Sequence, residues 1–322
     1  MSEPRQMTPQ SSDAEAFAHP VAKAQAREAM LPQNWRLIGI ITVMLGAVCY
    51  GLNVPVAGLA NRAGVSGSEI VLIRIAMLLA IILAYCSFQG VSLSVSRQSR
   101  PAILSLGVVS ALVSLAYVSS IAFIPVGIAA MVFYTFPIVV LLASPFIDRV
   151  KLTVFMLGAA ALTFSGIALA IGPGFNALDW RGVLLAAVAS LGAATQFFIG
   201  ARAPGGGGLA MIFWLQVIML PFALVSTFVF SAAPFAHLQA GLWPVLFSAL
   251  GAIIGIFCQY FGLARVGASL ASLIFCLEPI VSTLFSGWLL GEILSPAQYL
   301  GGVLVICGIL LSCLIPQQKA LA

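Results

Sequence analysis

Charged residues are scarce in this sequence, since only 7% of its 322 residues are Asp, Glu, Lys or Arg. Soluble domains carry about 25% of such residues, and this shortage excludes an ordinary water-soluble globule. The chain is instead 61% apolar, with a mean hydropathy of +1.13. That value excludes a disordered chain, because disordered segments are poor in apolar residues. A protein embedded in a membrane is the class that remains.

Motifs for metals, phosphates and catalysis are missing as well. The six cysteines form no Cys-x-x-Cys pair, and we interpret them as small packing residues. Neither His19 nor His237 has a second ligand at metal spacing, and the run Gly205–Gly208 lacks the Gly-Lys-Ser/Thr of a phosphate-binding loop. We therefore expect no enzyme activity, no metal and no cofactor. The net charge of +5 is interpreted as loop charge that favours anionic lipid, not nucleic acid.

Ten apolar runs alternate with charged residues, prolines and glycines, and each is close to the roughly 20 residues that cross a ~30 Å hydrocarbon layer. The sequence therefore predicts an all-α integral membrane protein with ten transmembrane helices. Residues 1–36 predict a disordered cytoplasmic tail without a cleaved signal peptide, and 317–322 a second tail. The predicted spans are Leu37–Leu59, Ile70–Gln89, Pro101–Ile121, Val126–Ile147, Thr153–Ile171, Gly182–Gly200, Leu209–Phe230, Leu242–Ala264, Ala268–Leu290 and Ala297–Ile315.

Lys and Arg fall mainly on one side of these spans. If the amino terminus is cytoplasmic, only Arg62 and Arg181 lie on the opposite side. The positive-inside rule then predicts that both termini are cytoplasmic. The cytoplasmic set is Arg5, Lys23, Arg27, Arg36, Arg97, Arg100, Arg149, Lys151, Arg202, Arg265 and Lys319.

The chain contains an internal repeat. The tripeptide Asn34-Trp35-Arg36 opens the first span and Asp179-Trp180-Arg181 opens the sixth, while Pro137-Ile138-Val139 returns as Pro279-Ile280-Val281 after 142 residues. We predict two five-helix halves, 37–172 and 182–316, joined by the loop 173–181. Because five is an odd number, the second half enters the membrane from the other side, as in inverted-repeat secondary transporters.

Two charged residues lie within predicted spans, where a charge costs at least ~2.5 kcal/mol. Glu278 is either a proton-accepting or substrate-binding carboxylate, or an acid that bonds to backbone groups freed at Pro279. Arg74 either anchors its helix as a snorkelling cation or binds an anionic group.

Prolines and polar residues mark a predicted site at the centre of the bundle. Each of the helix-break prolines frees a backbone carbonyl, which lipid tolerates only against protein or a water-filled cavity; static kinks are the alternative. The polar side chains are either ligand contacts or interhelical hydrogen bonds. Besides Glu278 and Arg74, the predicted site comprises Tyr50, Asn53, Tyr117, Tyr134, Gln196, Gln216, Gln259 and Tyr260, with helix breaks at Pro55, Pro137 and Pro279.

Over about residues 37–316 the chain resembles the EamA-type branch of the drug/metabolite transporter superfamily. The first half departs from the family pattern, because Phe136 precedes Pro137 where Glu278 precedes Pro279. The resemblance rests on Gly46–Asn53, Arg74, Val126-Gly127, Leu277-Glu278-Pro279, Gly291-Glu292 and Gly301-Gly302. It implies ATP-independent export or exchange of small metabolites, commonly amino acids or amphipathic compounds, across the bacterial inner membrane.

We therefore expect a carrier whose two halves rock about the predicted site and move a neutral, zwitterionic or partly aromatic solute. Protons are a candidate coupling ion, and the substrate, the direction of transport and the oligomeric state are left open. A non-transporting scaffold or sensor subunit is the alternative. An enzyme acting on lipid is a second alternative, but it needs a nucleophile and a base that the sequence lacks.

Overall fold

The computed structural model describes residues 33–149, 152–171, 179–202, 207–230, 233–291 and 293–314. Outside these ranges lie residues 1–32 of the predicted amino-terminal tail, the predicted tail 317–322, most of the predicted loop 173–181 and Glu292. Residues 33–36 are helical, so their assignment to the disordered tail was wrong. The described residues form helices and no strand. The helices are α3 (Gln33–Arg62), α4 (Gly67–Gln89), α5 (Arg100–Ser120), α6 (Val126–Phe133), α7 (Phe136–Ile147), α8 (Val154–Ile171), α9 (Trp180–Ala201), α10 (Leu209–Phe230), α11 (Leu238–Phe275), α12 (Leu277–Leu290) and α13 (Pro296–Leu314).

Within the described residues, eight helical segments are long and apolar enough to cross a membrane, and Val154–Ala170 is a shorter apolar helix. One of the eight, Leu238–Leu290, has 53 residues. At 1.5 Å per residue a straight helix of this length would measure about 80 Å, far more than one crossing needs. The chain turns within it at Gly267, whose backbone is non-helical (φ 79°, ψ 169°). The expected boundary at 265–267 falls at this turn.

The outer surface of the bundle is apolar, the reverse of a soluble protein. Phe88 and Phe146 are 88% and 87% exposed, and Leu314 is 80% exposed. Exposed apolar surface on this scale marks contact with lipid or partner proteins. The polar groups, by contrast, include thirteen buried residues of the described chain, among them Gln216, Ser144 and Ser269.

Helix α4 begins at a cap formed by its own side chains. Ser66 accepts a hydrogen bond from the Glu69 amide (3.3 Å), and the Glu69 carboxylate accepts one from the Ser66 amide (3.2 Å), which completes a capping box at the start of α4. The same buried carboxylate accepts from the Phe235 amide at 3.3 Å, so it also holds the segment that precedes α11.

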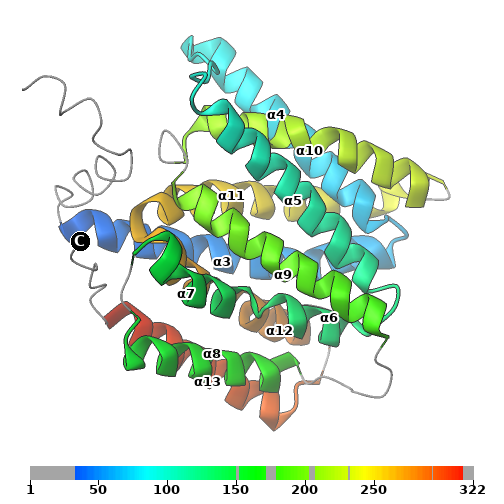
Figure 1. The fold of residues 1–322 in the computed structure, drawn as a ribbon. Helices are drawn as coiled ribbons and strands as arrows, with labels where there is room; N and C mark the ends of the chain where they lie inside the picture. Colours follow the sequence, from blue (N-terminus) through cyan, green and yellow to red (C-terminus); the bar gives the residue numbers. More distant parts are fainter. Residues whose placement is uncertain are drawn as a thin grey trace, which may run out of the picture.

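Helices α3 and α11 lie side by side through the middle of the bundle (Figure 1). Their contact is a glycine seam of Gly39, Gly46, Gly255 and Gly262. A Cβ on Gly262 would lie 2.5 Å from the Val43 side chain and 2.8 Å from the Gly39 carbonyl oxygen. Both pairs of glycines recur after seven residues, and their small size lets the two backbones approach closely.

The helix contacts repeat when the two halves of the chain are exchanged. Helix α3 packs on α11 and α12, while α9, its counterpart in the second half, packs on α5, α6 and α7. Helices α4 and α10 pack on one another, as do α8 and α13. This pattern is what two similar halves related by a pseudo-two-fold axis produce.

Two helix breaks fall at equivalent positions. Helix α6 ends at Phe133 and α7 begins at Phe136, next to Pro137; α11 ends at Phe275 and α12 begins at Leu277. The capping residues Tyr134 and Cys276 are 142 residues apart, the same displacement that separates the two prolines. Pro55 differs, because α3 continues through it without ending.

Candidate functional site

A cavity of about 160 Å³ lies inside the bundle, between α3, α4, α5, α9, α10 and α11. It is therefore bounded by helices of both halves of the chain. Six of the ten predicted binding or coupling residues line it: Tyr50, Arg74, Gln196, Gln216, Gln259 and Tyr260. Ser110 and Ser114 add two hydroxyl groups, and the apolar part of the lining is Leu78, Val113, Leu215, Met219, Ala252, Ile253 and Ile256.

Arg74 supplies the charge of this cavity. Among the described lining residues it is the only ionisable side chain other than two tyrosines. It is partly buried, and within the described residues it makes no ion pair. The Tyr50 phenol lies close enough to interact with it electrostatically. An arginine without a counter-charge inside a membrane protein is costly unless it faces water or a ligand.

Gln216 lies on α10 in the same lining and is 4% exposed. Its Oε1 atom has no hydrogen-bond partner among the described residues. An unsatisfied buried acceptor costs about 1–3 kcal/mol. Both Arg74 and Gln216 thus have unused hydrogen-bonding capacity, and both residues line the one small cavity.

Four phenylalanines form an aromatic wall beside the cavity: Phe133, Phe136, Phe197 and Phe275. Their ring centroids follow one another at 5.6, 5.1 and 5.4 Å. The wall ends at Tyr50, whose ring lies 6.0 Å from that of Phe275. Tyr50 therefore belongs both to the aromatic wall and to the lining of the cavity.

Glu278 lies apart from the cavity lining, in the first turn of α12. The Tyr134 hydroxyl lies near the Glu278 carboxyl group, and Tyr117 is near enough for the charge of Glu278 to act on it. Tyr134 and Tyr117 in turn contact the ring of Phe133, at 5.3 and 5.1 Å. The predicted site is therefore two sites, a cavity and an acidic cluster of Glu278, Tyr134 and Tyr117.

Tyr50 connects the two sites, because the charges of both Arg74 and Glu278 act on its phenol. Asn53, one turn further along α3, belongs to neither. Its Oδ1 accepts a hydrogen bond from Ser248 of α11, so it joins two helices. This is the interhelical role that the sequence allowed as an alternative.

A sequence profile of the EamA-like transporter family matches residues 37–172 and 180–314. The chain belongs to the EamA-like transporter family. The resemblance expected from the sequence is thereby confirmed, and the two matched segments are the two halves of the helix pattern above. With its apolar helices, an EamA-like chain of this kind is a multi-pass membrane protein.

Solved structures support the fold. The chain matches 29 solved chains, and one crystal structure of a protein that is 20% identical covers 88% of this chain and 99% of its own, with a TM-score of 0.71. At this identity the likeness concerns the fold alone. No curated protein matches the chain.

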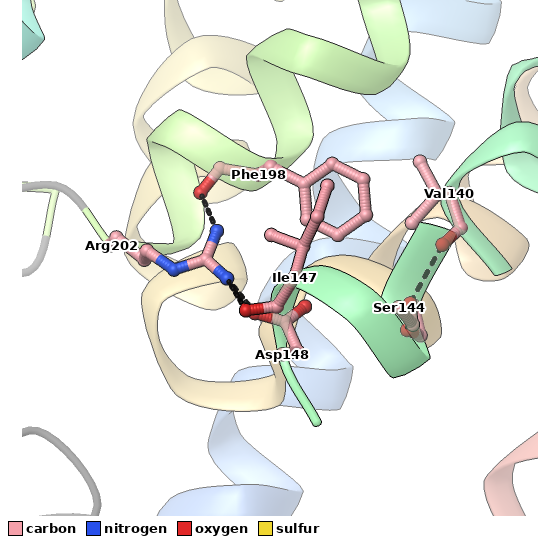
Figure 2. Close-up of polar contacts among 7 residues, drawn as sticks. Val140, Ser144, Ile147, Asp148, Phe198 and Arg202 are labelled. Atoms are coloured by element: carbon pink, nitrogen blue, oxygen red, sulfur yellow. Dashed lines mark hydrogen bonds and ion pairs between the residues drawn. The ribbon is translucent and has the colours of Figure 1, made fainter. Parts of the chain in front are cut away.

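The two EamA-like repeats are also joined at the end of α7. The Arg202 guanidinium, which follows α9, donates to the Ile147 carbonyl oxygen at 2.8 Å, to the Phe198 carbonyl oxygen at 3.1 Å and to the Asp148 carboxylate (Figure 2). One turn before Ile147, the buried Ser144 hydroxyl donates to the Val140 carbonyl oxygen and contacts that of Ser269 on α11.

Sequence reasoning missed the aromatic wall and the Arg202 contact. The chain has 21 phenylalanines, and nothing in their spacing separates rings that face the interior from rings such as Phe146 that face outward. A usable signal was the repeat itself, because Phe133 and Phe275 occupy equivalent positions immediately before the two helix breaks.

Proposed function

We propose that this protein is a secondary transporter that moves a small solute by alternating access, and that it exports the solute across the bacterial inner membrane. The observation that carries the proposal is the cavity, because it lies between helices of both repeats and combines a charged group, three amides and apolar walls. Relative movement of the repeats would open such a cavity to one side at a time.

We further propose ten crossings with both termini in the cytoplasm, as two inverted repeats. The turn at Gly267 divides the 53-residue segment into two crossings, and α8 supplies a short additional one. The beginning of α3 and the end of α13 lie on the same side of the bundle, which fits an even number of crossings (Figure 1). The excess of Lys and Arg assigns that side to the cytoplasm.

In this proposal the acidic cluster couples transport to protons. Glu278 is partly buried, and its carboxyl group can take up and release one proton beside the Tyr134 hydroxyl. It does not line the cavity, but its charge acts on Tyr50, which does. A proton on Glu278 and a solute in the cavity would then influence one another without direct contact.

The test is counterflow into proteoliposomes that contain the purified protein, with and without a proton gradient. Glu278→Gln keeps the shape of the side chain and removes its charge, so we expect it to change the transport rate or its dependence on pH between 5 and 8. Asp179→Asn at the start of α9 is the matched control. Unaltered transport by Glu278→Gln at every pH would remove Glu278 from the mechanism, and no movement of any solute would favour a scaffold or sensor.

A further inference from the structure

We infer that the transported solute is a small organic monoanion whose carboxylate pairs with Arg74 and whose hydroxyl group donates a hydrogen bond to Gln216. This inference rests on the proposed transport function and names the chemistry of its substrate. It is narrower than the neutral, zwitterionic or partly aromatic solute expected from the sequence, and it follows from which groups line the cavity.

The positive charge of Arg74 determines the sign of the charge that the solute can carry. Arg74 faces the cavity without a counter-ion within the described chain, and no carboxylate lines the space. Glu278, which could have neutralised Arg74, lies with Tyr134 outside the lining. A cation would be repelled here, whereas a zwitterion would pair its carboxylate but bury its ammonium group without an acidic partner.

The unpaired atom of Gln216 selects a second group on the solute. Its Oε1 is an acceptor, so it needs a donor, and Gln216 lines the same cavity as Arg74. A solute hydroxyl supplies that donor without adding a charge. Discrimination of this kind is strong, since a solute that lacks the hydroxyl leaves the buried amide unsatisfied.

The size and the walls of the cavity limit the carbon skeleton. An apolar cavity of about 150 Å³ holds a benzene molecule, and this one has about 160 Å³. The solute therefore has on the order of six to eleven non-hydrogen atoms. Leu215, Met219, Ile253 and Ile256 offer an apolar surface to its hydrocarbon part.

The experiment compares solutes of one shape and four charge states: lactate, alanine, 1-amino-2-propanol and propane-1,2-diol, and the same four with phenyl in place of methyl. Binding is measured as the rise in the Tm of the detergent-solubilised protein, and counterflow is measured for the lactate and alanine pairs against empty liposomes. We expect a hydroxy acid to bind and to move roughly tenfold better than its amino acid, the effect of one charged hydrogen bond.

Four variants assign the roles. Arg74→Gln should abolish the preference for the hydroxy acid, Arg74→Lys should retain part of it, and Arg62→Gln, an exposed arginine at the end of α3, should leave it unchanged. Gln216→Leu should reduce binding of lactate to the level of propionate, which lacks the hydroxyl. Size-exclusion chromatography checks that each variant is folded.

The outcomes separate the inference from the transport function. If alanine moves as fast as lactate, if the amine raises the Tm as much as lactate does, or if Arg74→Gln keeps the wild-type preference, the anion assignment is overturned while the transporter stands. If no solute moves but the hydroxy acids still raise the Tm through Arg74, the site stands and the transport function fails.

Discussion

The Arg202 guanidinium of the second repeat is bonded to the Asp148 carboxylate at the end of α7, in the first repeat (Figure 2). The pair is 42% and 23% exposed, and Arg202 also bonds to the Ile147 carbonyl oxygen of the same segment. It is thus a partly hydrated contact that joins the two repeats at one end of the bundle. A carrier that opens at this end must break it.

We therefore expect Asp148→Asn to favour the state that is open at this end. Partly exposed ion pairs contribute up to about 1 kcal/mol, so the Tm should fall little, but an equilibrium between two states would shift about fivefold. The measurement is the counterflow rate together with the Tm in detergent. The charge-reversed double variant Asp148→Arg, Arg202→Asp should recover the wild-type rate; if it behaves like the worse single variant, the ion pair has no gating role.

A second prediction concerns the place where α3 touches α12. A Cβ on Gly51 would lie 2.7 Å from the Glu278 carbonyl oxygen and 2.7 Å from the Val281 Cβ. We expect Gly51→Ala to push α12 away, to cost about 1–3 kcal/mol and to slow transport. Gly58→Ala on the same helix is the matched control, because its Cβ would find only Leu290 at 3.6 Å. Equal Tm values for the two variants would contradict this packing.

A third prediction tests the acidic cluster. Tyr134→Phe keeps the ring that packs on Phe133 but removes the hydroxyl beside Glu278. We expect the dependence of transport on pH to move toward that of Glu278→Gln, while the Tm changes by the equivalent of about 1 kcal/mol or less. Tyr299→Phe, an exposed tyrosine on α13, is the control. A pH profile identical to wild type would mean that Tyr134 only packs.

Much of the architecture can be predicted from the sequence, because a segment that crosses the lipid bilayer must be a long apolar helix. Apolar length marked the helices, the repeated proline at 137 and 279 marked both helix breaks, and Gly267 marked the turn between two helices. Polar residues in an apolar environment are conspicuous for the same reason, and the sequence alone therefore predicts Gln196, Gln216 and Gln259, which all line the cavity.

The rest depends on how the helices are rotated and which of them meet, and hydropathy carries no information on either. For that reason the sequence predicts Glu278 in the same site as Arg74, although Glu278 is not among the residues that line the cavity. The pairing of Gly39 and Gly46 with Gly255 and Gly262 is likewise a contact between distant segments. A proline such as Pro55 can also be accommodated within a continuous helix, so its position alone does not predict a break.

The equivalence of the two helix breaks has a consequence for the resting state of the protein. Tyr134 and Glu278 meet, yet the residues that correspond to them after 142 positions are Cys276 and Phe136, which cannot form the same polar contact. Exchanging the roles of the repeats therefore does not return an identical structure. Two conformations related by the pseudo-symmetry must differ in free energy, so the empty carrier should spend most of its time facing one compartment.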